Sequence, residues 1–262
     1  MIDWIHQLPP AVAAFAICAA FLVPMIAGSC LIQPSVARLF RGERDINTVL
    51  GFLLNTFALY FGVLLALLSI AVYENRNKAQ DTIEAEAGTI MVLDRHLLAY
   101  PQAESAALRA DLKAYLDEEI GPGWREQAAG RASGRAPEIL DRLYLRLAAY
   151  APAAGSGDAL RHAETLRQFD RFAEARRKRV DSADSSVPGL VWTVVLIGAA
   201  INMVVIWMFD ISRTAHGLVG GTLAIFVGLV IYMIAALDAP FRGAHGLAPD
   251  ALSAVARQIG AR

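Results

Sequence analysis

The sequence predicts an all-α integral membrane protein with four transmembrane helices and a cytoplasmic helical bundle between helices 2 and 3. Apolar residues make up 56% of the 262 residues and charged residues 19%, whereas an ordinary soluble domain is about a quarter charged. The charges are also uneven, because 36 of the 49 acidic and basic residues lie between Glu74 and Val187. The chain therefore divides into transmembrane helices 1 and 2 (1–73), the polar insert (74–187), and transmembrane helices 3 and 4 with a short tail (188–262).

Four uncharged stretches are long and apolar enough to cross a bilayer, which requires about 20 mostly apolar residues. They cover residues 11–32, 46–73, 185–209 and 214–237. No Lys or Arg precedes the first stretch, as a secretory signal would require, so we expect it to remain a membrane helix. Pro24 falls inside this stretch and is expected to kink it, which membrane helices tolerate.

Basic residues near the span ends predict the orientation. Four spans put both termini and the insert on one side of the membrane, with nine basic residues near the span ends against four on the other side. The nine are Arg76, Lys78, Arg171, Arg176, Arg177, Lys178, Arg179, Arg242 and Arg257; the four are Arg38, Arg41, Arg44 and Arg213. The excess predicts that both termini and the 74–187 insert are cytoplasmic.

The insert is expected to consist of helices, because apolar residues recur every three or four positions and no alternating pattern is present. The expected helices cover about residues 83–98, 103–120, 137–150 and 159–180, and continue from the ends of spans two and three. Gly121-Pro122-Gly123 is expected to break the second helix.

A run of basic residues, Arg176 to Arg179, lies shortly before the third span, and two interpretations are open. The run is a juxtamembrane cluster that contacts anionic headgroups, or it forms a charged vestibule that attracts anions. Asp238 and Arg242, which follow the fourth span, are further juxtamembrane charges that end the helix and can pair.

One narrow face of the second span carries small and polar residues at helical spacing. Its members are Gly51, Asn55, Ala58, Gly62 and Ser69, with Ala66 and Tyr73 on the same side. Small residues allow close helix packing, which requires no further function. Alternatively, the face lines a pore around a symmetry axis. Asn55 separates the two interpretations, because packing alone does not require a carboxamide there.

Spans three and four carry residues expected at helix contacts. Gly217 and Gly221 have the four-residue spacing of a tight helix contact, and Gly228 extends the same theme. Asn202 in span three should face protein or water, because an unpartnered amide in lipid is costly.

The sequence carries no pattern that predicts an enzyme, a cofactor site or a metal site. The five histidines have no paired metal-ligand spacing with one another or with cysteine, and no phosphate-binding loop or nucleophile elbow is present. The net charge of −1 argues against a nucleic-acid partner.

The chain resembles the bacterial bestrophin-like membrane proteins over nearly its whole length. The resemblance rests on the two-plus-two spans around a helical insert and on four sets of residues. These are Glu84-Ala85-Glu86-Ala87, then Arg176 and Arg179 ahead of Pro188, then Trp192, and the ending Asp238, Pro240, Phe241 and Gly243. The Asp-x-Pro-Phe ending is the most specific of them.

The resemblance implies kinship with bestrophin anion channels, whose second span lines the pore. No acidic cluster follows the last span, so calcium gating is not expected. We therefore expect a homo-oligomeric ion channel of the bacterial inner membrane, with anions slightly preferred among inorganic ions and the lipid bilayer as its surroundings. The alternative is a non-conducting membrane scaffold or sensor whose cytoplasmic bundle binds a partner.

Overall fold

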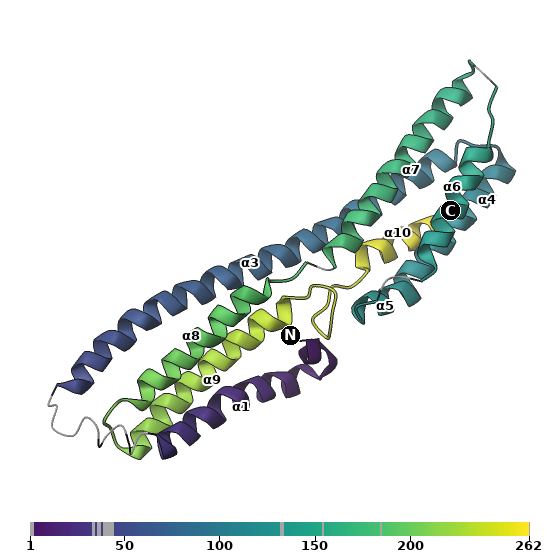
Figure 1. Ribbon diagram of the computed structural model, residues 1–262. Helices are drawn as coiled ribbons and strands as arrows, with labels where there is room; N and C mark the ends of the chain where they lie inside the picture. The colour runs from purple at the N-terminus through teal and green to yellow at the C-terminus, as the bar shows by residue number, and fades with distance from the viewer. Residues whose placement is uncertain are drawn as a thin grey trace. The chain divides into compact units, whose positions relative to one another are not determined.

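The computed structural model describes residues 3–32, 35, 38, 45–131, 134–153, 155–183 and 185–261. In these residues the regular structure is entirely helical (Figure 1). Four of the helices are long and apolar enough to cross a membrane, as the uncharged stretches predict. They are α1 (Pro10–Leu31), α3 (Ile46–Leu97), α8 (Gly189–Trp207) and α9 (Arg213–Leu237), and a short 3₁₀ helix, η1 (Asp3–Gln7), precedes α1.

The chain forms two compact units. Unit 1 comprises Met1–Glu74 and Ser186–Asp238, and unit 2 comprises Asn75–Ser185 and Ala239–Arg262. The C-terminal residues thus group with the polar insert, because Leu252, Val255 and Ile259 of α10 (Asp250–Gly260) are buried in the core of unit 2.

Unit 1 is a bundle of α1, the first part of α3, α8 and α9. In Figure 1, α9 lies between α8 and α1, and it contacts both. The core brings together Phe61 and Leu65 of α3, Trp192 and Val195 of α8, and Ile234 of α9. Helix α1 runs through Pro24 without ending there.

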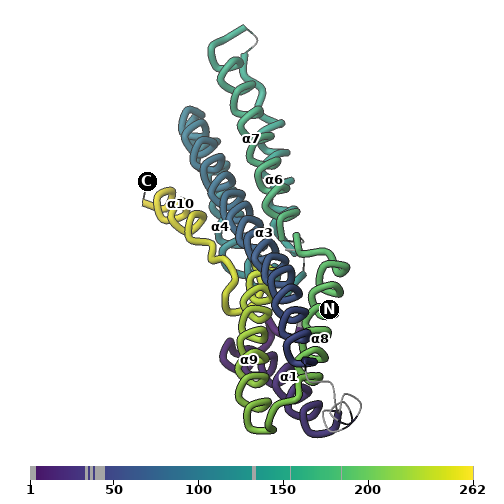
Figure 2. The backbone as a smooth tube through the Cα atoms, turned by 90° about the vertical axis from the view of Figure 1, so that its left-hand side faces the viewer, coloured from purple at the N-terminus to yellow at the C-terminus, as the bar shows by residue number. Residues whose placement is uncertain are grey.

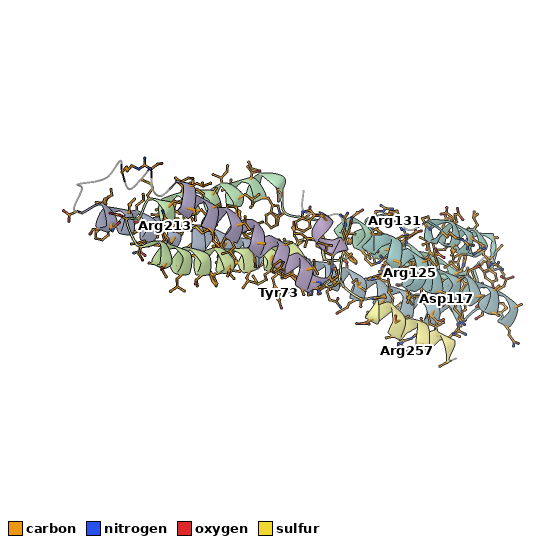
Figure 3. All side chains as sticks on the ribbon, turned by 90° about the horizontal axis from the view of Figure 1, so that it is seen from below. Tyr73, Asp117, Arg125, Arg131, Arg213 and Arg257 are labelled. Carbon is orange, nitrogen blue, oxygen red and sulfur yellow. The ribbon has the colours of Figure 1, made fainter. Side chains whose placement is uncertain are left out.

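Unit 2 consists of the second part of α3 and the helices that pack on it. These are α4 (Gln102–Glu118), the π-helix η2 (Glu119–Gly123), α5 (Trp124–Ala128), α6 (Ala136–Ala149), α7 (Gly157–Ser182) and α10. Helix α10 lies beside α4 (Figure 2). The core is built from leucine, isoleucine and aromatic side chains on the inner faces, while charged side chains such as Asp117, Arg125 and Arg257 project from the surface (Figure 3).

Two local expectations are wrong. Gly121-Pro122-Gly123 does not break the helix but forms part of η2, whose wider turn accommodates a proline that has no N–H to donate. Helix α3 does continue from span two into the insert, but α7 ends at Ser182 and α8 begins at Gly189. The ring of Pro188 disfavours helical backbone at the residue before it, and Pro188 itself is extended, so α8 begins only after it.

Candidate conduction surface and its supports

The part of α3 in unit 1 has one side that packs inside the chain. Phe61, Leu65, Leu68 and Val72 are buried on this side and recur every three or four residues. Phe61 lies closely over Gly198 of α8, where an added Cβ would come within 2.8 Å of the ring. At the start of α3, the Asn47 side chain exchanges two hydrogen bonds with the backbone of Asp210, at 2.9 and 2.8 Å. These contacts fix the rotation of α3 about its axis.

A second side of α3 carries the small and polar residues, about 80° away around the helix. Asn55, Ala58 and Gly62 are exposed, and Gly51 and Ser69 are partly exposed. A Cβ added at Gly51 or Gly62 would meet no atom within 4 Å. The Ser69 hydroxyl donates to the Leu65 carbonyl of its own helix at 2.7 Å. All five residues thus lie on one side of α3 that the described residues leave exposed or partly exposed.

Asn55 is the one carboxamide on this side. Among the described residues its amide has no hydrogen-bond partner and is open to the surroundings. An amide at membrane depth without a partner costs free energy, so Asn55 requires water, an ion or a second copy of the chain beside it.

A third side of α3 carries large apolar side chains that are exposed. They are Phe52, Leu59, Val63, Leu67 and Ile70. Such a surface suits lipid tails, whereas the side with Asn55 and the two glycines does not. The three sides therefore differ in chemistry: one is packed, one is apolar and one is small and polar.

The glycines of α9 meet α1 of the same chain. A Cβ at Gly228 would lie 3.0 Å from the Cys18 Cα, and one at Gly221 would lie 3.5 Å from Leu22. Gly217 is exposed, and a Cβ added there would meet no described atom within 4 Å, so its expected helix packing stays a prediction. Gly220, one turn along, is buried against Met25 instead.

Asn202 of α8 is half-buried and lines a small cavity of about 30 Å³ in unit 1. The cavity is otherwise apolar, with Phe21 and Met203 among its walls. A cavity of this size has room for about one water molecule. Asn202 thus borders a space between the helices of unit 1.

Asp238 connects the end of α9 to the start of α8. Its carboxylate accepts a hydrogen bond from the Val187 N–H at 2.7 Å and another from the Trp192 indole at 3.1 Å. Arg242 belongs to unit 2, where its guanidinium lies over Gly130. Asp238 is therefore a structural acceptor at the end of the α9 helix.

The basic run Arg176–Arg179 is not a uniform headgroup-binding cluster. Arg177 and Lys178 are exposed, but Arg179 is fully buried, so the expectation of headgroup contact is wrong for it. Arg179 bonds to Glu86 of α3 and lies 2.9 Å from Glu119 of η2. Arg176, largely buried, lies 3.1 Å from the same Glu119.

Neighbouring side chains complete this buried cluster. Arg179 donates to the Gln127 side-chain oxygen at 2.6 Å and lies 5.5 Å above the Trp124 ring. Burial would lower the pKa of Arg179, but its two carboxylate partners outweigh burial and raise it. Burial and the same carboxylates raise the pKa of Tyr115 well above its usual value, so Tyr115 stays protonated and donates to Glu86.

Sequence reasoning missed Glu86, Glu119 and Tyr115 as members of this cluster. One signal for Glu86 was present, because it lies three residues after Ile83 and four before Ile90 on an apolar stripe. A carboxylate at such a position is buried and needs a cationic partner.

The four apolar helices and the helical insert define an integral membrane protein of the two-plus-two type. The sequence matches the model of the bestrophin-like domain over residues 12–252, and the chain belongs to this family.

Solved structures show the same fold. A variant of a bacterial bestrophin homologue from Klebsiella pneumoniae is 11% identical, with 94% of this chain and 96% of that chain covered and a TM-score of 0.71. A second variant of that homologue is 11% identical, with 92% and 97% covered and a TM-score of 0.67. A structure described as a membrane protein is 12% identical with the same coverage and TM-score. No curated protein matches the sequence.

Proposed function

We propose that the protein is an ion channel, assembled from several copies, whose pore is lined by the face of α3 that carries Gly51, Asn55, Ala58, Gly62 and Ser69. The observation that carries the proposal is the difference between the three sides of α3. In the part of the chain that the structure describes, no element packs on the small, polar side, and this side is not apolar enough for lipid. Membership of the bestrophin-like family supports the same conclusion. The proposal assigns no catalytic reaction to the chain.

Assembly follows from the geometry of one face. A single helix side cannot enclose a water-filled path, so several copies must turn it toward a shared axis. Around that axis Asn55 would form a ring whose amide N–H groups solvate anions and whose oxygen atoms solvate cations. Gly62 and Ala58 add little side-chain volume and leave width beside the ring. The preference for anions follows the resemblance to bestrophin anion channels.

The proposed orientation places both termini and the insert in the cytoplasm, with the protein in the inner membrane. Arg41 and Arg44, which count toward it, and Ser133, which tests it, lie outside the described residues. Ser133→Cys, made with Cys18 and Cys30 replaced by serine, should react with a membrane-impermeant maleimide only after the inner membrane is permeabilised. Reaction from outside intact cells would reverse the orientation.

Planar-bilayer recordings of purified protein test the pore. Asn55→Leu keeps a similar volume but removes every donor and acceptor, so it should sharply reduce conductance without loss of assembly. Asn55→Asp should shift the reversal potential toward cations, because a ring of carboxylates repels anions. Thr56→Val is the matched control: it removes a polar group from an exposed neighbour about 100° around the helix. It should leave conductance unchanged.

Two results would contradict the proposal. If both Asn55 variants lower stability and neither alters conductance or selectivity, Asn55 bridges packed helices. If the wild-type protein is silent with different anions and across a range of pH, the scaffold or sensor alternative replaces the channel.

A further inference from the structure

Unit 2 holds a pocket of about 240 Å³ that the conduction hypothesis does not use. It lies where the residues after α3 and α6 meet the first two turns of α7. Tyr100 and Tyr150 come from the two chain segments that follow α3 and α6, and Asp158, Arg161 and His162 come from α7. The segment after α3 therefore meets the neighbouring segments at the end of α6 and the start of α7 in one surface depression.

Three aromatic rings form the inner wall of this pocket. The centroid distances are 4.9 Å for Tyr100–Tyr150, 5.5 Å for Tyr150–His162 and 6.0 Å for Tyr100–His162. The Tyr100 hydroxyl lies within hydrogen-bond distance of His162 Nδ1, at 2.7 Å, and burial raises the pKa of Tyr100, so the hydroxyl stays protonated. Because the rings pack on one another, they leave no slot between them, and the pocket beside them has a mixed polar and aromatic lining.

Opposite charges stand together at the rim. Arg161 Nη1 lies 3.3 Å from Asp158 Oδ1, and the two side chains are 64% and 62% exposed. An exposed pair of this kind contributes little stability in water, so a ligand can separate it at small cost. Arg161 offers a forked donor for a carboxylate, and Asp158 offers an acceptor for an ammonium group.

We propose that this pocket binds a zwitterionic amino acid with an apolar or aromatic side chain. Its carboxylate would meet Arg161, its ammonium would meet Asp158, and its side chain would lie on the Tyr100–Tyr150 wall. A ligand with a single charge satisfies one rim residue and is repelled by the other, whereas a zwitterion satisfies both. The volume is below the roughly 300–1,000 Å³ of pockets for drug-sized ligands, which suits a single amino acid.

Isothermal titration calorimetry of the purified full chain tests this with three probes that share a phenyl ring. L-Phenylalanine should bind saturably, and 3-phenylpropionate and phenethylamine, which each lack one charge, should bind at least about tenfold more weakly. Arg161→Gln and Asp158→Asn should each weaken phenylalanine binding by about tenfold. Both positions are exposed, so the fold should be unaffected.

The same helix offers a matched control pair. Arg167 and Glu164 have the same three-residue spacing, lie 2.8 Å apart, and do not line the pocket. Arg167→Gln and Glu164→Gln should leave phenylalanine binding unchanged. The proposal fails if phenylalanine gives no saturable heat at concentrations up to about 10 mM, because a specific site would be saturated at that concentration. It fails equally if 3-phenylpropionate binds as tightly as phenylalanine, or if the control pair weakens binding as much as the rim pair.

Discussion

Replacing Arg179 by methionine should loosen unit 2 far more than the same replacement one residue earlier. The Arg179 side chain is fully buried between the fully buried carboxylates of Glu86 and Glu119. Its removal leaves two buried carboxylates with one remaining cation, Arg176, beside one of them. Breaking a buried pair in this way costs about 3–5 kcal/mol, because a buried charge is left uncompensated.

Lys178→Met is the matched control, since it also removes one positive charge from α7. Lys178 pairs with Glu174 at 2.8 Å, but both side chains are more than 60% exposed, at 67% and 63%. An exposed pair of this type contributes between zero and about 1 kcal/mol. The two variants therefore share a change in net charge and differ in burial.

Amide hydrogen exchange measured by mass spectrometry can locate the effect. Peptides that cover residues 111–127 should exchange about a hundredfold faster or more in Arg179→Met. A loss of about 3–5 kcal/mol in stability lowers the opening free energy by that amount, and each 1.4 kcal/mol is about a factor of ten in exchange rate. Peptides from α9 should serve as an unchanged reference. Adding Glu86→Gln to Arg179→Met should recover part of the protection, because one uncompensated charge is removed.

Equal exchange in the Arg179 and Lys178 variants would refute this reasoning, because the burial of Arg179 would then make no difference. A double variant that exchanges faster than Arg179→Met alone would also refute it. In that case the Glu86 carboxylate would stabilise the bundle through another partner.

Two further predictions concern unit 1. Gly228→Ala should lower the melting temperature in detergent, because its Cβ would lie 3.0 Å from the Cys18 backbone, and overpacking costs about 1–3 kcal/mol. Gly217→Ala is the control and should leave the melting temperature unchanged, because its Cβ would meet no described atom within 4 Å. Equal losses in both variants would show that the contact with α1 is not tight. Asp238→Ala should also lower the melting temperature, because it leaves the Val187 N–H and the Trp192 indole without their acceptor, and each unsatisfied buried donor costs about 1–3 kcal/mol. An unchanged melting temperature would show that water replaces the carboxylate.

The membrane spans could be predicted from sequence because charge marks them directly. The predicted span 185–209 corresponds to α8, Gly189–Trp207, and 214–237 to α9, Arg213–Leu237. The continuation of α3 from Tyr73 to Leu97 was also expected, but the break between Ser182 of α7 and Gly189 of α8 was not. Charge shows where lipid ends, but a helix ends only where capping, proline or packing stops it.

The buried ion-pair cluster of unit 2 was harder to predict because its members are distant in sequence. Arg179 and Glu86 are 93 residues apart, and a charged residue is exposed by default. The glycine contact of α9 illustrates the same limit. The sequence indicated Gly217, Gly221 and Gly228 but not Gly220, which Met25 of α1 covers, because one helix alone does not reveal where its neighbour lies.

Chemical modification of cysteines on α3 during bilayer recording tests the proposed pore most directly. Gly62→Cys places a thiol on the small, polar side, where an added Cβ meets nothing within 4 Å, and Val63→Cys places one on the exposed apolar side. With Cys18 and Cys30 replaced by serine, a charged, water-soluble methanethiosulfonate should alter the current of the Gly62 variant and leave that of the Val63 variant unchanged. Absence of current in the unmodified protein, or equal modification of both variants, would contradict a pore lined by this face of α3.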